Sequence, residues 1–311
     1  MFTLLAIYIS LLTCTPGKEM YARYGHTALR VVDTEQQMDV CFNYGMFDFN
    51  TEHFYYKFVR GETYYQLGAE DTYSFLMAYQ MEGRQVYEQQ LNLTDSQAVA
   101  VRDALIENYQ PENRQYLYNF VFDNCATRPL AVIEKAVGDT IRSTYSGWKG
   151  KTFRQILQYY TGMHSWAEFG TNLLFGRRAD REMTQREKTF LPEQLMLYLS
   201  YATFSDGTPV VAKEHIGAFR VQPVRWYETW YVGLALFVLL FGALCIYDRL
   251  RCRISYGVDI ALAIVYVIVF IIVVFLTFFS IHPLVGFNWR LFLFPALHAA
   301  LRFGSKRIIR W

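Results

Sequence analysis

The sequence is poor in the features that identify several common classes of protein. Its 311 residues include only five cysteines, with no CxxC pair and no His/Cys cluster at metal-ligand spacing. These are too few for a disulfide scaffold and argue against a structural zinc site, so we expect neither a metal nor another cofactor. The formal net charge of +2 gives no reason to expect a nucleic-acid partner. A glycine-rich phosphate loop, an internal repeat and a low-complexity tract are also missing from the sequence.

Charged residues are missing from two long segments near the C-terminus. Residues 230–247 and 260–281 contain no Asp, Glu, Lys or Arg, and each is long enough to cross a hydrocarbon core of roughly 30 Å as a helix. A third apolar run, near 289–303, predicts either a third span or a partial, re-entrant one. The sequence therefore predicts a membrane domain at 230–311. The preceding residues, 1–229, mix charges, turns and short apolar runs as a soluble domain does.

The distribution of arginines predicts the orientation of these spans. Arg249, Arg251 and Arg253 lie between the first two spans, whereas the segment after the second span carries only Arg290. The positive-inside rule therefore places the loop with three arginines in the cytoplasm. We expect an inner-membrane protein whose domain at 1–229 faces the periplasm. The aromatic content of 18% suits a protein that works at a lipid boundary.

The first residues are apolar but are a poor match to a signal sequence. They have neither a basic n-region nor a small-x-small cleavage site. We therefore expect Ile7–Cys14 to be the first strand of the domain, with an export signal either missing from this start or supplied by residues 1–10. Cys14 and Cys41 both lie on expected strands, and they could pair in an extracytoplasmic domain. The sequence leaves that pairing open.

Short periodic segments predict an α+β fold for the N-terminal domain. Residues 24–33 and 38–49 read as two strands of a hairpin, and the aromatic segment 53–68 also reads as strand-like, with a turn at Gly61. Residues 94–109 begin with a Thr-x-x-Gln capping box and carry an apolar face, which predicts a helix. We expect a small antiparallel sheet with helices packed on it.

Cys125 stands where a helix is expected to begin. It follows an Asp-Asn pair, and Pro129 must lie within the first turn of the helix. Free backbone N–H groups and the positive end of the helix dipole favour a thiolate at this position. Cys125 is thus a candidate nucleophile, and the amides of Cys125 and Ala126 are candidate donors to an oxyanion. The alternative is a buried, inert thiol.

A cysteine nucleophile needs a base, usually a histidine, and a group that orients it. The N-terminal domain offers four histidines: His26, His53, His164 and His215. His26 is favoured because it follows Gly25 at the start of a strand whose hairpin partner carries the polar Asn43. Asn43 could complete a Cys-His-Asn set, with Asp39 as the second choice for that role. A lone histidine in a strand is more often a core or surface residue, so this set is a hypothesis.

Two more residues are candidates for substrate binding. Arg128, one turn into the same helix, could contact a lipid phosphate, although a solvated helix residue would look the same. His164 lies among aromatic residues and could line a lipid or substrate groove, the alternative being a structural role.

Several blocks of the sequence together resemble a known family. They are "SLLTCTPGKEMYARYGHTALRVVD", "VCFNYGMFDF", "RGETYYQLG", "YQPENRQYLYNFVFDNCATRPL", "GKTFRQIL" and "WAEFG". Over about residues 10–300 the chain resembles the Lnb-type lipoprotein N-acyltransferases of Bacteroidetes, which have an outward thiol domain followed by membrane helices. More distantly, the order of His, polar residue and Cys resembles the permuted papain-like (NlpC/P60-like) folds.

The resemblance implies an enzyme that uses Cys125 as nucleophile and His26 as base. A thioester on the cysteine would carry an acyl group from a phospholipid to the α-amino group of a diacylglyceryl-cysteine lipoprotein. Two other classes of function stay open. One is a membrane-tethered thiol hydrolase, either a phospholipase or a peptidase, with the same residues. The other is a membrane-anchored binding protein without enzymatic activity.

Overall fold

The computed structural model describes residues 6–221, 223–252 and 256–292. The described chain divides into two compact units. The first contains residues up to Lys151 together with Glu182–Val221, and the second contains Thr152–Arg181 together with the residues from position 222 onward. The predicted boundary at 229/230 thus marks the start of the first long helix rather than an edge between the units. It stays a prediction of where the membrane domain begins.

The first unit is built on an antiparallel sheet of seven described strands, in the order β6-β4-β3-β2-β1-β5-β9. The expected strand at Ile7–Cys14 is β1, an interior strand between β2 and β5, and the expected hairpin is formed by β2 and β3. The strands span β1 Ile7–Cys14, β2 His26–Asp33, β3 Met38–Met46, β4 Tyr64–Asp71, β5 Val86–Leu91, β6 Gln115–Leu117 and β9 Val211–His215, and a separate pair is formed by β7 Arg142–Ser143 and β8 Ala202–Thr203.

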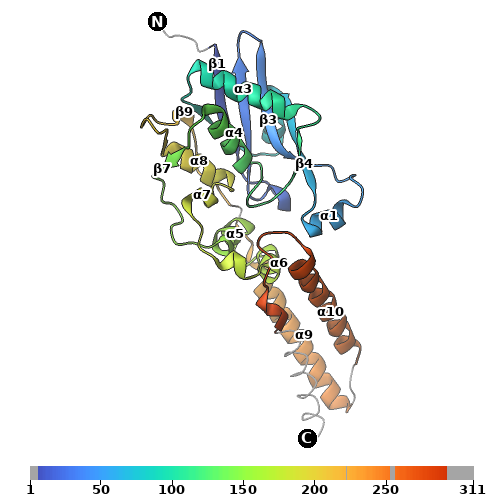
Figure 1. The fold of residues 1–311 in the computed structure, drawn as a ribbon. Helices are drawn as coiled ribbons and strands as arrows, with labels where there is room; N and C mark the ends of the chain where they lie inside the picture. The colour runs from blue at the N-terminus through green and yellow to red at the C-terminus, as the bar shows by residue number, and fades with distance from the viewer. Residues whose placement is uncertain (1–5, 222, 253–255, 293–311) are drawn as a thin grey trace. The chain divides into compact units, whose positions relative to one another are not determined.

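Helices cover both faces of this sheet. On one face, α3 and α4 bury a large apolar cluster that includes Leu11 and Leu29 from the strands and Leu105 and Ile133 from the helices (Figure 1). On the other face a smaller cluster gathers around Phe75 of α2. The helices of the first unit are α1 Phe54–Arg60, α2 Thr72–Met81, α3 Asp95–Tyr109, α4 Thr127–Val137, α7 Gln185–Lys188 and α8 Pro192–Ser200, with the short 3-10 turn η1 at Met20–Ala22. The predicted α+β class is confirmed.

One predicted element is wrong. The segment Phe54–Arg60 is the helix α1 instead of a strand, and only the part from Tyr64 onward pairs as β4. The helix ends at Gly61, whose left-handed backbone (φ 78°) makes a C-terminal cap, at the point where the turn was expected. Phe54 is buried and stacks on Phe47 at a centroid distance of 5.8 Å, so packing outweighs the β-propensity of the aromatic residues.

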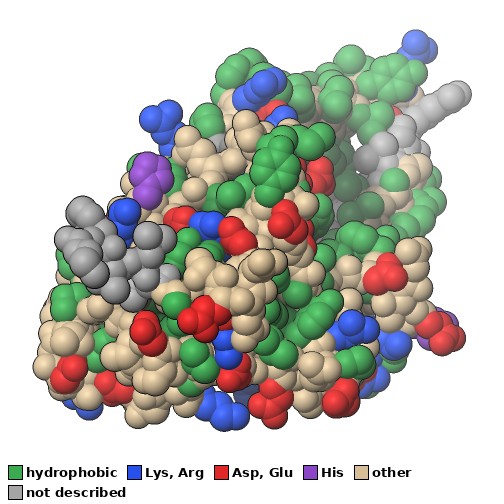
Figure 2. Space-filling model, turned by 90° about the horizontal axis from the view of Figure 1, so that it is seen from above, with side chains coloured by type: hydrophobic (Ala, Val, Ile, Leu, Met, Phe, Trp, Pro, Cys, Tyr) green, Lys and Arg blue, Asp and Glu red, His purple; other side chains and the backbone are tan. Residues whose placement is uncertain are grey.

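The predicted capping box is confirmed. The Thr94 side chain accepts a hydrogen bond from the Gln97 amide, the Gln97 side chain accepts one from the Thr94 amide, and α3 follows. On the surface of the protein, acidic and basic side chains are interspersed over the face shown in Figure 2. This mixture agrees with the near-zero net charge.

The second unit contains two long apolar helices, α9 Trp230–Arg251 and α10 Tyr256–Phe279. Among the described residues these are the two helices long and apolar enough to cross a membrane. The unit also contains α5 Phe153–Thr161 and α6 Trp166–Leu174, and the 3-10 turns η2 Arg177–Asp180, η3 Trp226–Glu228 and η4 Trp289–Phe292. Of the third predicted run, 289–303, only the start lies in the part of the chain that the structure describes, as η4, and positions 293–303 lie outside it.

Candidate active site

The structure brings His26 and Cys125 together at the end of the sheet where β2 begins and β3 ends. Continuing the β2–β3 register, in which Leu29 faces Phe42, brings position 26 opposite Gly45. Gly45 lies at an irregularity of β3 and has a left-handed backbone (φ 96°). A Cβ placed on Gly45 would lie 3.5 Å from the Cβ of Cys125 and 3.9 Å from Cε1 of His26. The two candidate catalytic side chains therefore face the same small space.

The position of His26 is fixed by the preceding residue, Gly25, and by a hydrogen bond to the neighbouring strand β3. Gly25, just before it, has φ 81°, and a Cβ there would come within 2.6 Å of the Cys14 carbonyl oxygen. Glycine is therefore required at this position. The imidazole Nε2 forms a short hydrogen bond with Oδ1 of Asn43 on β3, and Asn43 is buried. Because a carbonyl oxygen only accepts, Nε2 carries the proton and Nδ1 is left as the basic nitrogen.

Asp39, the second choice for the orienting group, is engaged elsewhere. Its carboxylate accepts two hydrogen bonds from the guanidinium of Arg30, at 2.8 and 2.7 Å. This ion pair holds the pKa of the Asp39 carboxyl below its usual value. The structure thus pairs His26 with Asn43 and leaves Asp39 to Arg30.

Cys125 is positioned by its neighbour Asn124, which is almost fully buried. The Asn124 side-chain amide donates to the carbonyls of Phe120 and Phe190, at 2.7 and 2.8 Å. Its oxygen accepts hydrogen bonds from the backbone amides of Ala126 and Thr127, at 2.8 and 2.9 Å. All of its hydrogen-bonding groups are used to fix the loop that carries Cys125 and to cap α4. We did not predict this role, although an asparagine at the start of an expected helix is a known capping signal.

One of the two predicted oxyanion donors is wrong for this reason. The Ala126 amide already donates to Asn124, so it does not point freely at a substrate. The backbone amides of Cys125 itself and of Thr27, the residue after His26, instead act on the thiol and lower its pKa. These two amides are therefore the candidate oxyanion donors in place of the Ala126 amide.

Burial determines the protonation states of Cys125 and His26. It raises the pKa of the Cys125 thiol to about 11, and the amides of Thr27 and Cys125 only partly offset this. Burial also lowers the pKa of His26 to about 4, against the opposing effect of its hydrogen bond to Asn43. The expected thiolate at the helix start is therefore not the resting state. At neutral pH the site holds a neutral thiol beside a neutral imidazole.

Two tyrosines near the thiol stack on each other. Tyr65 and Tyr118 stack with their ring centroids 4.1 Å apart, and both interact electrostatically with Cys125. Burial raises the pKa of both phenols. These rings make the neighbourhood of the sulfur apolar, which suits an acyl chain more than a charged peptide.

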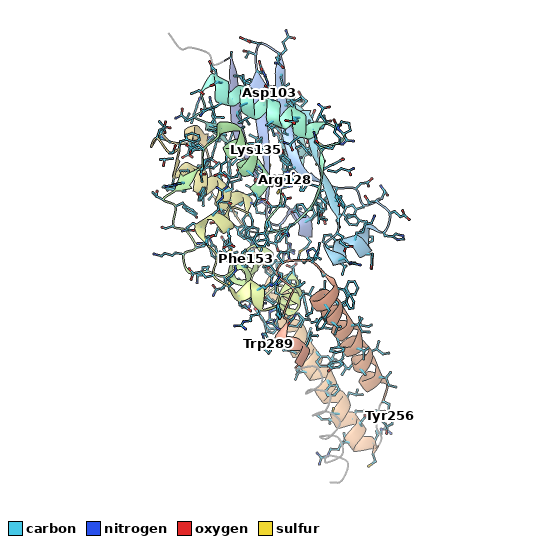
Figure 3. All side chains as sticks on the ribbon, in the orientation of Figure 1. Asp103, Arg128, Lys135, Phe153, Tyr256 and Trp289 are labelled. Atoms are coloured by element: carbon cyan, nitrogen blue, oxygen red, sulfur yellow. The ribbon has the colours of Figure 1, made fainter. Side chains whose placement is uncertain are left out.

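Arg128 is neither free nor simply solvated. It lies in the first turn of α4, at the opposite end from Lys135 (Figure 3). Its guanidinium makes two hydrogen bonds to Asp123, at 2.6 and 2.8 Å, and lies 3.6 Å from the ring centroid of Tyr116. The ion pair between Arg128 and Asp123 thus connects the two ends of the loop that carries Cys125. The predicted contact of Arg128 with a lipid phosphate stays a prediction.

The other histidines are not brought to Cys125 within the first unit. His53 and His215 are exposed, and His53 pairs with Glu52. His164 belongs to the second unit, where its ring contacts Tyr231 edge-on. Its predicted place in a substrate groove stays a prediction.

Among the described residues no group of three or more His, Cys, Asp and Glu could hold a metal ion. Cys14 and Cys41 are both buried and unpaired with each other.

Comparison with known families identifies both parts of the chain. Residues 2–159 match the Lnb N-terminal periplasmic domain, which is about half of the chain, and residues 226–308 match the Lnb transmembrane domain. The chain belongs to the Lnb family. No curated protein and no solved structure that was compared matches it. The protein is thus a membrane protein whose N-terminal domain faces the periplasm, which confirms the orientation predicted from the arginines.

Proposed function

We propose that this Lnb-family protein is a lipoprotein N-acyltransferase that works through a thioester on Cys125. Membership of the family supports an enzyme that processes membrane lipoproteins. The observation that carries the finer proposal is the arrangement of three side chains at one end of the sheet: Cys125 at the start of α4, His26 beside it on β2, and Asn43 bonded to the imidazole.

In the first half-reaction the Cys125 sulfur attacks the carbonyl carbon of a phospholipid acyl ester while Nδ1 of His26 takes the thiol proton. Asn43 stabilises the imidazolium that forms by accepting from Nε2. The tetrahedral oxyanion takes hydrogen bonds from the amides of Cys125 and Thr27. When the ester C–O bond breaks, the imidazolium gives its proton to the alcohol of the lyso-phospholipid, and the acyl group stays on sulfur.

In the second half-reaction the neutral α-amine of a diacylglyceryl-cysteine attacks the thioester carbonyl. Its excess proton passes to Nδ1 of His26, the C–S bond breaks, and the imidazolium returns the proton to the Cys125 thiolate. The products are an amide on the lipoprotein and the starting enzyme. The Cys125 thiol is neutral before and after the complete reaction. His26 therefore has to accept and return only one proton in each half-reaction.

A membrane-tethered thiol hydrolase would use the same residues, with water in place of the amine. The match to a transmembrane domain favours the transferase, because both the donor ester and the lipid-anchored amine are concentrated at the membrane surface. The aromatic residues before α9 suit that surface, and Trp226 and Tyr227 are both exposed.

Purified protein incubated with acyl-labelled phospholipid and a synthetic diacylated lipopeptide tests the proposal. We expect the label on the lipopeptide amine, with lyso-phospholipid as co-product. Cys125→Ala and His26→Ala should each abolish transfer, and the double variant should lose little more than either single one, because the two residues act as a unit. The matched controls are Cys252→Ala and His53→Ala, at exposed positions, which should keep full activity.

The label distinguishes the possible outcomes. If free fatty acid dominates with lipopeptide in excess, the protein is a lipase and the transferase proposal is wrong. If Cys125→Ala keeps the activity of the natural chain, the thioester is wrong, and a binding protein or another nucleophile must be considered.

A further inference from the structure

Two consecutive arginines, distant in sequence from Cys125, line a pocket in the second unit. The pocket has a volume of about 370 Å³ and is lined by Arg177, Arg178 and Phe287. Both arginines lie in the turn η2 and are exposed. The volume falls in the range of roughly 300–1,000 Å³ that is usual for small-molecule sites. The proposed chemistry at Cys125 does not use this pocket.

The pocket is built from two segments that the backbone holds together. The Gly176 amide donates to the Leu284 carbonyl at 2.8 Å, and the Arg177 amide donates to the Phe287 carbonyl at 3.2 Å. A Cβ on Gly176 would come within 1.9 Å of the Gly286 carbonyl oxygen, so only glycine allows this approach. The η2 turn is therefore tied to the loop that follows α10, and the position of both arginines is fixed by backbone contacts.

The charges of these two arginines are not balanced by a neighbouring carboxylate. No ion pair is formed by Arg177 or Arg178 within the described residues. The acid nearest in sequence, Asp180 of the same turn, is bonded to Arg154 at 2.5 and 3.1 Å. Arg178 does contact the ring of Phe287, with its guanidinium carbon 5.7 Å from the ring centroid, and this contact leaves its charge unbalanced. Two neighbouring arginines that pair with no carboxylate among the described residues and line the same pocket favour an anion, which they can bind by charge-assisted hydrogen bonds.

The location of the pocket identifies the class of anion. The loop with Phe287 follows the last residue of α10, at the end of the helix pair where α9 begins. In Figure 3, Trp289 marks this end and Tyr256 marks the opposite one. Because the N-terminal domain faces the periplasm, this end lies at the periplasmic surface of the membrane. Phe287 and Trp289 are both exposed, as is typical of aromatic residues at a lipid–water interface.

We infer that Arg177 and Arg178 bind the phosphate of a phospholipid headgroup in the periplasmic leaflet. Phe287 covers the apolar part of the glycerol backbone, and the acyl chains stay in the bilayer beside α10. That this lipid is the acyl donor rests on the proposed function. The binding itself rests only on the pocket and its place at the membrane.

Lipid binding can be measured independently of acyl transfer in a Cys125→Ala background, which cannot form a thioester. The full-length chain in detergent micelles is titrated with short-chain phosphatidylglycerol and, separately, with diacylglycerol of the same chains, and bound lipid is counted by native mass spectrometry. We expect a preference for the phospholipid of about tenfold or more, since only it carries the phosphate.

Arg177→Gln/Arg178→Gln should remove this preference, and Arg177→Lys/Arg178→Lys should keep most of it, because lysine also binds phosphate. Gly176→Ala should weaken binding by displacing η2 from its partner loop. The matched control is Lys213→Gln/Arg220→Gln, which removes the same charge from exposed positions of the first unit and should leave the preference unchanged.

Two results would overturn the inference. One is an unchanged preference in the glutamine pair. The other is displacement of the lipid by inorganic phosphate with the same affinity as phosphatidylglycerol, which would make this a free-phosphate site. If phosphatidylglycerol binds as expected but no acyl group reaches a lipopeptide in the natural chain, the lipid site stands and the proposed transferase fails.

Discussion

The charge state of Cys125 is the property of this site that is most open to direct measurement. A cysteine protease of the papain type holds its cysteine as a thiolate, with a pKa of roughly 3 to 4, through an ion pair with histidine. Here burial raises the pKa of the Cys125 thiol to about 11 and lowers that of His26 to about 4. Both groups are therefore neutral between these values, and raising the pH should titrate the thiol alone.

The size of the effect follows from the pKa. At pH 7 a thiol of pKa about 11 is ionised in about one molecule in 10⁴. Compared with the ordinary value of 9.0, the ionised form is disfavoured by about 2.7 kcal/mol. Alkylation proceeds through the thiolate, so its rate should rise about tenfold with each pH unit and should still be rising at pH 10.

The assay is the rate of iodoacetamide modification at Cys125 between pH 6 and 10, followed by mass spectrometry of the peptide that contains it. Free cysteine serves as the standard and should level off near its own pKa. In the same preparation, the acid limb of kcat/KM for acyl transfer should fall near pH 4, where His26 becomes protonated, rather than near 6.5.

The reasoning is refuted if the alkylation rate levels off below pH 8, because that requires a stabilised thiolate. His26→Ala provides the second check. Since the neutral pair contains no imidazolium, the variant should alkylate at pH 7 within about a factor of three of the natural chain while losing transfer. A much slower alkylation would show that His26 stabilises a resting thiolate.

Two substitutions test how the site is held. Gly25→Ala should lower kcat/KM by about 100-fold, because a Cβ there meets the Cys14 carbonyl at 2.6 Å and must displace His26. Gly83→Ala is the matched control, with a similar φ of 69° but open space around it, so it should lose about 1–2 kcal/mol of stability and no activity. Asn124→Ala should destabilise the protein by about 2–4 kcal/mol in thermal unfolding, because it leaves two buried carbonyls and two helix amides without partners. Asn124→Asp keeps the acceptor oxygen but loses the amide donor, so its stability should lie between those of the natural chain and Asn124→Ala. Equal melting temperatures for the natural chain and both variants would contradict the structural role assigned to Asn124.

Local sequence signals predicted several of the elements that carry the candidate site. The capping box at Thr94 and the proline in the first turn of α4 act within a few residues, so they place helices correctly from sequence. The Gly-His pair and the helix-start cysteine made His26 and Cys125 the candidates, and the structure places their side chains near each other beside Gly45.

Properties that depend on packing between distant segments could not be predicted in the same way. The choice of Asn43 over Asp39 follows from the β2–β3 register and from the position of Arg30, which takes the carboxylate. The charge of the Cys125 thiol depends on its burial in the folded domain, which outweighs the nearby backbone amides of Thr27 and Cys125. The strand predicted at α1 failed because the aromatic residues there pack on Phe47 as a helix.

The neutral thiol also has a consequence for the lifetime of the protein. The periplasm is an oxidising compartment, and peroxides and disulfides react with cysteine as its thiolate. A nucleophile kept as a permanent thiolate would be exposed to sulfenic acid formation whenever no substrate was bound. In the proposed reaction Cys125 is ionised only as it attacks an ester, so between turnovers the chain would carry little of the form that oxidants consume.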